Sequence, residues 1–241
     1  MSNPHDYPTV AEYPISQRWP AQHPELIQLY SLGTPNGVKI SIALEELGLA
    51  YEAHRVTLAD EDVKSAEFLS LNPNNKIPAI IDPNGPEGKP IGLFESGAIL
   101  VYLAEKTGQL MGSTPTDKIK VLQWLMFQMG GVGPMFGQLG FFFAYAGKEI
   151  EDPRPRERYI NETKRLLNVI DQQLEGQEWI AGEYSIADIA IVPWLETVAK
   201  FYKADEVTGL AEYKNVMAYI ERFTARPAVQ RGWAVPPSQN S

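Results

Sequence analysis

The sequence predicts a mixed α/β domain followed by an all-helical domain. Up to residue 108, short apolar strands alternate with amphipathic helices, which is the pattern of helices packed on a sheet. After Pro115 the apolar residues recur only with helical spacing. The chain has 241 residues, 44% of them hydrophobic, so two modest domains with ordinary cores are expected. We place an N-terminal extension at 1–25, the α/β domain at 26–108 and the helical domain at 116–235.

The N-terminal extension contains five prolines and no periodicity of a helix or a strand, so we expect an extended arm. Tyr7, Tyr13 and Trp19 each precede a proline and follow one another at a spacing of six residues. A polyproline II helix has about three residues per turn, so this spacing would put all three rings on one face. We expect the arm to dock on the rest of the protein through these rings. The alternative is a disordered tail.

The α/β domain is predicted to have seven elements in the order β-α-β-α-β-β-α. Its third strand opens directly after Pro78, and Ser96 stands where an N-cap of the last helix is expected. Turn-forming residues at 83–86 join the last two strands into a hairpin. The expected strands are 26–31, 51–56, a short strand from 79, and 91–94, and the expected helices are about 36–47, near 63–70, and 96–108.

The stretch 29–37 is a strand-to-helix elbow that turns through Gly33. Thr34 stands at the N-cap position of the following helix and Pro35 at its first position. A hydroxyl and several unpaired backbone N–H groups should therefore point into the same space. Such a corner suits an anion or a thiolate.

The helical domain is predicted to contain long amphipathic helices at about 116–146, 154–175, 186–200 and 212–223. Ser185 and Asp188 resemble a capping box at the start of the third of these helices, with Tyr184 and Ile189 as the hydrophobic staple. Glycines and a proline at 130–134 should kink the first helix. Methionine and aromatic residues crowd 129–145, where core packing is favoured over a pocket for an apolar ligand.

Charge and residue usage exclude several classes of function. The formal net charge is −9 and the basic residues are scattered, which disfavours nucleic-acid binding. Neither a signal peptide nor a membrane-spanning run is recognisable, so a cytoplasmic location is expected. With no cysteine and three histidines that lack metal-ligand spacing, a metal site is not expected. Any sulfur chemistry must use a thiol that arrives with a ligand.

Four short motifs together resemble the cytosolic glutathione transferases, and within them the Nu class. They are Thr-Pro-Asn-Gly at 34–37, Asn-Asn-Lys-Ile-Pro at 74–78, Phe-Glu-Ser-Gly-Ala-Ile at 94–99 and Glu-Arg-Tyr at 157–159. The resemblance covers about residues 26–235. It implies a thioredoxin-like N-terminal domain, a C₂ homodimer and a glutathione-dependent disulfide-bond reductase that holds two glutathione molecules or one glutathione disulfide. The expected partners are glutathione and a small disulfide or electrophile, without nucleic acid or membrane.

The resemblance also implies roles for individual residues. Thr34 and Asn36 would act on the glutathione sulfur, and a cis peptide bond would precede Pro78. Glu95 would pair with the γ-glutamyl ammonium group and Ser96 with its carboxylate. The residues implied to bind glutathione are Lys76, Ile77, Pro78, Glu95, Ser96 and Arg158. The segment 60–65 lies where the family has a glutamine that touches glutathione, and no residue there matches it.

A physical reason for Thr34 can be given independently of the resemblance. A thiol has a pKa near 8.5 and is mostly protonated at neutral pH. A hydrogen bond to a charged group contributes about 1.5–3 kcal/mol, so the Thr34 hydroxyl and the helix N-terminus could lower the pKa of a bound thiol by about one to two units. Some peroxidase activity is expected beside the disulfide reductase activity. The alternatives are a conjugating transferase or lyase for electrophiles and thioethers, and a non-enzymatic glutathione-binding regulator.

Overall fold

The computed structural model describes residues 7–236, and its described part divides into two compact units. The first unit contains the chain up to Thr107 together with the residues from Ala228 onward, and the second contains Gly108–Pro227. Residues 1–6 of the predicted N-terminal extension lie outside the described part. In that part, no helix is both long and apolar enough to cross a membrane.

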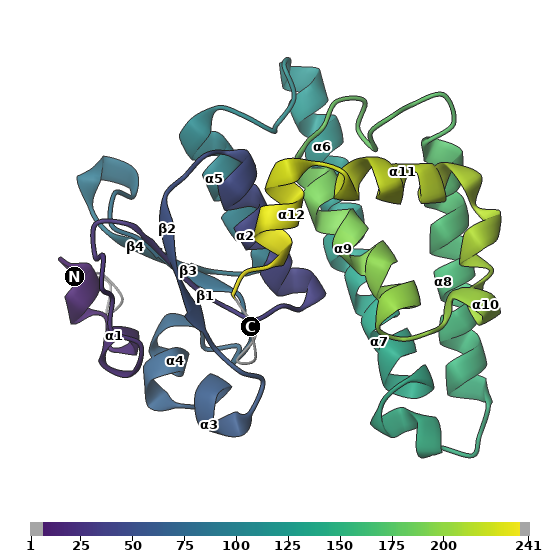
Figure 1. Cartoon of the computed structure of the whole chain (residues 1–241), viewed down its shortest axis with the longest axis horizontal. Helices are drawn as coiled ribbons and strands as arrows, with labels where there is room; N and C mark the ends of the chain where they lie inside the picture. The colour runs from purple at the N-terminus through teal and green to yellow at the C-terminus, as the bar shows by residue number, and fades with distance from the viewer. Residues whose placement is uncertain (1–6, 237–241) are drawn as a thin grey trace. The chain divides into compact units, whose positions relative to one another are not determined.

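The first unit is built on a four-stranded mixed sheet with the strand order β2-β1-β3-β4 (Figure 1). Strands β1 and β2 are parallel, whereas β3 is antiparallel to both β1 and β4. The predicted order of elements along the chain, βαβαββα, and the hairpin of the last two strands are confirmed, as in a thioredoxin-like domain. The strands are β1 Ile27–Ser31, β2 Tyr51–Arg55, β3 Ala79–Asp82 and β4 Ile91–Phe94.

The two faces of the sheet carry different helices. Side chains of neighbouring strand residues point to opposite faces of a sheet, so Leu29 and Tyr30 of β1 pack on opposite faces. Both residues are fully buried. Tyr30 shares a hydrophobic cluster with Phe68 of α4, while α2 and α5 lie side by side on the other face (Figure 1). The helices of this unit are α2 Pro35–Glu46, α3 Asp60–Val63, α4 Ala66–Leu71, α5 Ser96–Thr107 and α12 Pro227–Trp233.

Two helix boundaries differ from the prediction. The single helix expected near 63–70 is two short helices, because Ser65 breaks the run and caps α4 by accepting a hydrogen bond from the Phe68 N–H. Ser96 is the first residue of α5 and not its N-cap. The preceding residue, Glu95, has the cap role, since its carbonyl accepts the first helical hydrogen bond, from Ile99.

The N-terminal segment is not the extended arm that was expected. Residues Val10–Glu12 form a 3₁₀-helix and Ile15–Arg18 form the short helix α1. The expected docking is nevertheless present, because Tyr7, Tyr13 and Trp19 all join the hydrophobic cluster around Phe68. Burial of Val10 and Ile15 favours compact turns over a polyproline II helix, in which hydrogen bonds are absent.

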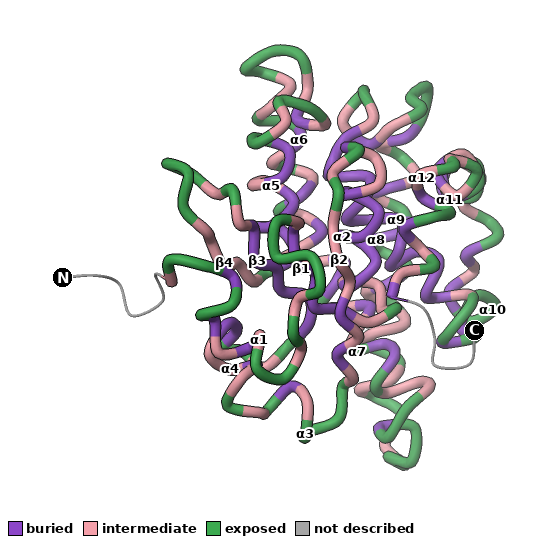
Figure 2. The backbone as a smooth tube through the Cα atoms, turned by 60° about the vertical axis from the view of Figure 1, so that its left-hand side comes forward, coloured by how far each residue is buried: buried purple, intermediate pink, exposed green. Residues whose placement is uncertain are grey.

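The second unit is entirely helical, as predicted. The helix expected at 116–146 is divided at the glycine-rich stretch into α6, a π-helical segment and α7. The capping box at the start of α9 is confirmed, and α9 is buried along most of its length (Figure 2). The helices are α6 Pro115–Phe127, the π-helical segment Gln128–Val132, α7 Gly133–Phe143, α8 Arg154–Gln173, α9 Ile186–Lys200, α10 Asp205–Thr208 and α11 Lys214–Thr224.

Candidate functional site

The register of the sheet brings three of the predicted motifs to one edge of the first unit. Tyr30 of β1 pairs with Ala79 of β3, and Ala79 pairs with Phe94 of β4. These three residues form a row near the end of β1, the start of β3 and the end of β4. The segments that adjoin the row are the elbow containing Thr34, the loop ending at Pro78, and the turn into α5 at Glu95. Residues distant in sequence therefore meet at this edge.

Thr34 is the N-cap of α2, as the sequence predicts. Its backbone is extended, with φ −105° and ψ 163°, and its half-buried side-chain oxygen accepts the Gly37 N–H at 3.2 Å. An oxygen that accepts this bond still has its own hydrogen to donate to a ligand. Gly37 is required, because a Cβ there would lie 1.9 Å from the carbonyl oxygen of Leu32. Asn36, also half-buried, lies in the first turn of the same helix.

Glu95 and Ser96 form the turn into α5. Glu95 is exposed and has a φ of +69°, a left-handed conformation that costs a residue with a side chain about 1 kcal/mol or more. Such strain is concentrated at functional sites, where the surrounding structure imposes it. Ser96, in contrast, is buried, with 4% of its surface exposed. It lies at the N-terminus of a helix of 12 residues, where backbone N–H groups favour an anion.

Lys39 is a site residue that sequence reasoning missed. It lies on α2, its exposed fraction is 0%, and its Nζ donates a hydrogen bond to the Ser96 Oγ at 3.2 Å. Burial lowers the pKa of Lys39 to about 7, and the charge of Glu95 acts in the opposite direction. A signal was present: Lys39 shares a helix face with the buried Ala43 and Leu47, at i, i+4 and i+8.

The loop before β3 contains the cis peptide bond between Ile77 and Pro78 that the resemblance implied. Hydrogen bonds from the Asn72 side chain hold this loop: its amide donates to the Lys76 carbonyl, and its side-chain oxygen accepts the Asn74 N–H at 2.9 Å. Ile77 is buried, while the Lys76 side chain is exposed. The loop can therefore offer a ligand its backbone groups and the cationic side chain of Lys76.

The remaining predicted positions lie elsewhere in the chain. Arg158 is exposed on α8 in the second unit. In the segment 60–65, Asp62 accepts hydrogen bonds from Thr57 and from Arg18. Because these contacts are internal to the first unit, they identify no replacement for the family glutamine. Within residues 7–236, no group of three or more histidine, aspartate and glutamate side chains could hold a metal ion.

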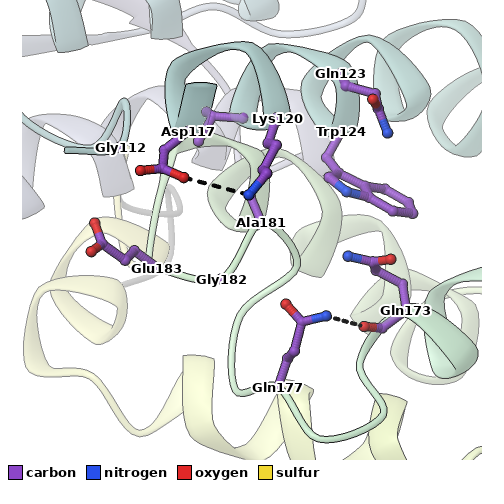
Figure 3. Close-up of a pocket in the computed structure, with 11 residues that line it drawn as sticks. Gly112, Asp117, Lys120, Gln123, Trp124, Gln173, Gln177, Ala181, Gly182 and Glu183 are labelled. Carbon is purple, nitrogen blue, oxygen red and sulfur yellow. Dashed lines mark hydrogen bonds and ion pairs between the residues drawn. The ribbon is translucent and has the colours of Figure 1, made fainter. Parts of the chain in front are cut away.

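A separate pocket of about 530 Å³ lies within the second unit (Figure 3). It is formed by α6, the end of α8 and the loop around Gly182. Asp117 and Lys120 form an ion pair of 3.6 Å at one side, and the Gln177 side chain donates to the Gln173 carbonyl at the other. None of the residues that the sequence singled out lines it. The lining residues are Gly112, Asp117, Lys120, Val121, Gln123, Trp124, Gln173, Gln177, Ala181, Gly182 and Glu183.

Family models and known proteins match most of the chain. Residues 25–105 match the model of the glutathione S-transferase N-terminal domain, and residues 135–227 match that of the C-terminal domain. The disulfide-bond oxidoreductase YfcG of Escherichia coli is 45% identical over 205 residues, which cover 84% of this chain and 92% of YfcG.

Two crystal structures resemble this one over almost the whole chain. A glutathione transferase from Pseudomonas putida, with one glutathione disulfide bound per subunit, is 59% identical with a TM-score of 0.93, covering 95% of this chain and 99% of that one. A glutathione transferase from Burkholderia graminis, with two glutathione molecules bound per subunit, is also 59% identical with a TM-score of 0.93, covering 95% of this chain and 96% of that one.

Proposed function

Because this chain belongs to the glutathione S-transferase family, we propose that it is an enzyme that reduces disulfide bonds with glutathione. One observation carries the proposal. The chain has no cysteine, yet it is 59% identical to proteins that hold two glutathione molecules or one glutathione disulfide per subunit, and 45% identical to a disulfide-bond oxidoreductase. Both sulfurs of a thiol–disulfide exchange can then come from glutathione.

The reaction proceeds in two exchanges. The thiolate of the first glutathione attacks a substrate disulfide, forming a mixed disulfide and releasing one substrate thiolate. The thiolate of the second glutathione attacks the glutathione sulfur of the mixed disulfide, releasing the other substrate thiolate and leaving glutathione disulfide. The two protons lost by the glutathione thiols end on the two substrate thiolates. Two glutathiones and one disulfide become glutathione disulfide and two thiols.

The protein contributes position and charge. The Thr34 hydroxyl donates to the first glutathione sulfur and, with the N-terminus of α2, favours the thiolate. Asn36, in the first turn of the same helix, can donate to or accept from that glutathione. The loop at Lys76, Ile77 and Pro78 offers backbone groups to the cysteinyl portion, in the manner of an added strand.

The γ-glutamyl end of glutathione carries both charges of an amino acid. The exposed Glu95 carboxylate pairs with its ammonium group, and the N–H and hydroxyl of Ser96 take its carboxylate. The left-handed conformation of Glu95 supports this assignment, because nothing in the formation of α5 requires an acidic residue there. Arg158 is predicted, on the resemblance, to contact a glutathione carboxylate. A homodimer and a cytoplasmic location are likewise inferred from the family.

Activity profiling tests the proposal. Purified protein is given glutathione with a small model disulfide, and glutathione disulfide is measured through NADPH-dependent glutathione reductase. We expect turnover well above the uncatalysed exchange. In a crystal of the complex with glutathione disulfide, we expect two glutathione moieties in each active site. Good conjugation of an aryl halide without turnover of the disulfide would overturn the proposal in favour of a conjugating transferase. If the protein bound glutathione but turned over no disulfide, peroxide or electrophile, a non-enzymatic glutathione-binding regulator would be the favoured function.

A further inference from the structure

The one charged side chain of α2 that is fully buried, Lys39, has no part in the mechanism above. Every residue from Gly37 to Leu44 is buried, so Lys39 stands in the middle of a helix face enclosed by protein. Lysine is almost never fully buried unless it is paired, because its ammonium group loses its hydration. A methionine would fill the same space without that cost. The presence of an amine here therefore points to a use for its charge or its hydrogen bonds.

The hydrogen bond from Lys39 to Ser96 has a defined direction. In its ammonium form Lys39 has donors only, so the Lys39 Nζ then donates and the Ser96 Oγ accepts, at 3.2 Å. The hydroxyl of Ser96 then directs its own hydrogen away from Lys39. Lys39 thereby prepares Ser96 to donate to an anion at the N-terminus of α5, and it adds a positive charge behind the same hydroxyl.

The electrostatic surroundings make Lys39 responsive to such an anion. Burial lowers the pKa of Lys39 to about 7, whereas the negative charge of Glu95 raises it. Near neutral pH the amine is therefore only partly protonated. A ligand carboxylate at Ser96 brings a second negative charge close to Lys39, which favours the ammonium form. Binding of the carboxylate and protonation of Lys39 are then linked.

We propose that Lys39 is a positioning residue for the γ-glutamyl carboxylate of glutathione, orienting the Ser96 hydroxyl and taking up a proton as the carboxylate binds. The inference rests on the proposed binding of glutathione at Ser96. It adds a residue that touches no substrate atom itself. It also predicts a pH dependence of binding that a merely structural lysine would not produce.

Calorimetry of S-methylglutathione binding tests the inference. This ligand has no thiol to ionise, so proton exchange at the sulfur is absent. Titrations at pH 7.5 in phosphate and in Tris, which differ in ionisation enthalpy, give the number of protons taken up. Because burial lowers the pKa of Lys39 to about 7, we expect a net uptake of protons on binding to the native protein. The dissociation constant should rise as the pH is raised from 6.5 to 8.5.

Two variants separate the role of Lys39 from a general effect of charge. Lys39→Met keeps the aliphatic stem, and we expect it to abolish the proton uptake and to weaken binding about tenfold, the loss of one hydrogen bond to a charged group. Lys89→Met removes an exposed lysine of the same unit, and we expect native binding and native uptake. In combination with Ser96→Ala, Lys39→Met should add little further loss, because both changes remove the same contact.

The outcomes distinguish this inference from the proposed function. A native protein that binds no S-methylglutathione contradicts the proposed function. Native binding with the same enthalpy in both buffers, or an affinity that does not fall with rising pH, contradicts the role of Lys39 while leaving the function intact. Both of these contradicting outcomes are measured on the native protein, so the role of Lys39 can be refuted even if Lys39→Met does not fold.

Discussion

At the scale of single residues, the site uses groups that also build the fold. Thr34 caps α2 and is proposed to hold a thiolate, and Ser96 begins α5 while its oxygen accepts from Lys39. A substitution at either position therefore changes stability together with chemistry. Replacing a threonine N-cap costs about 1 kcal/mol of folding free energy, which a marginally stable domain tolerates.

The first prediction concerns Thr34. We expect Thr34→Val to slow disulfide reduction about 10- to 100-fold, because the thiolate loses one charge-assisted hydrogen bond. The pKa of bound glutathione should rise by about one to two units, measured from the ultraviolet absorbance of the thiolate. The affinity for S-methylglutathione should stay within about threefold, since that contact is made by the ionised sulfur.

Thr34→Ser is the matched control, because it keeps both the hydroxyl and the cap. It should retain most of the rate and the native thiol pKa. An unchanged rate in Thr34→Val would remove Thr34 from the mechanism and leave it as a cap alone.

The second prediction concerns the fold of the helical unit. The buried Asp188 carboxylate accepts the Tyr219 hydroxyl at 2.7 Å and the N–H groups of Ile180 and Ser185 at 2.9 and 2.8 Å. The Ser185 hydroxyl donates to the same carboxylate at 3.1 Å. We expect Asp188→Ala to lower the free energy of unfolding by about 3 kcal/mol or more, because it leaves four buried donors without their acceptor. Urea unfolding followed by circular dichroism measures the loss.

Tyr219→Phe removes only one of those donors together with its hydroxyl, so a loss of about 1 kcal/mol is expected. Equal losses in the two variants would show that the hydroxyl contact accounts for the whole effect and that the capping box contributes nothing.

At the scale of elements, the N-terminal segment 7–24 is held against the rest of the first unit by specific contacts. The Trp19 Nε1 donates to the Arg55 carbonyl at 3.1 Å, and Arg18 forms an ion pair of 2.6 Å with Asp62. The Glu52 carboxylate of β2 accepts the backbone N–H groups of Gln22 and His23 at 2.8–3.0 Å. Three contacts along the segment thus hold it against β2 and α3.

The third prediction is an acid-induced loosening of this segment. Burial raises the pKa of Glu52, but the N–H groups of Gln22 and His23 outweigh it and hold the pKa below its ordinary value of 4.5. A carboxyl group with a depressed pKa in the folded state contributes stability that is fully present above the unfolded pKa. That contribution is lost as the pH falls below 4.5 and through the folded pKa.

Hydrogen exchange followed by mass spectrometry measures the loosening. After correction for the intrinsic rate, peptides from 7–24 should lose protection on acidification before peptides from α9 do. In Glu52→Gln the protection of 7–24 should be weaker at neutral pH and should fall less on acidification, the remaining dependence coming from the Arg18–Asp62 ion pair. Equal pH dependence in the two peptides would mean that acid unfolds the protein as a whole and that Glu52 does not anchor the segment.

The elements also show what sequence patterns can predict. The order of strands and helices was predictable because each has its own periodicity and its own terminating glycine or proline, as at Gly48 and Pro78. The helical turns of the N-terminal segment were not, because they are four residues or shorter and are stabilised by contacts to distant residues such as Phe68. Propensity carries little information over so short a stretch.

The residues of the candidate site likewise fall into those that the sequence predicts and one that it does not. Thr34, Glu95 and Ser96 were recognisable from motifs, and the register of the strands brings their segments to one edge of the sheet. Lys39 was missed although it shares a helix face with Ala43 and Leu47, because a lysine next to apolar helix residues is usually solvated. Its burial follows from the packing of α2 on α5, a tertiary contact that the helix pattern alone does not specify.

At the scale of the whole molecule, the first and the last described residues belong to the same unit. The chain builds the sheet, then the helical unit, and the residues from Ala228 onward belong again to the first unit. Helix α12 is held to α2 by the Ser41 hydroxyl, which donates to the Gly232 carbonyl at 2.6 Å, and by an ion pair of 2.6 Å between Arg231 and Glu45. The helix that carries Thr34 and Lys39 is thus supported by the end of the chain.

The last prediction tests this support. A Cβ at Gly232 would lie 2.5 Å from the Cα of Ile42, a backbone atom of α2 that cannot move aside, so Gly232→Ala forces the two helices apart. We expect it to lower the free energy of unfolding by about 1–3 kcal/mol in urea. Because α2 also positions Thr34, disulfide reduction should fall in the same variant.

Gly130→Ala is the matched control, since a Cβ there meets no atom within 4 Å. It should leave the rate unchanged, and it should leave the stability unchanged or raise it by about 0.4–1 kcal/mol, because alanine restricts the unfolded chain more than glycine does. If Gly232→Ala were as stable and as active as the native protein, the close packing of α12 on α2 would not be what holds the proposed catalytic helix in place.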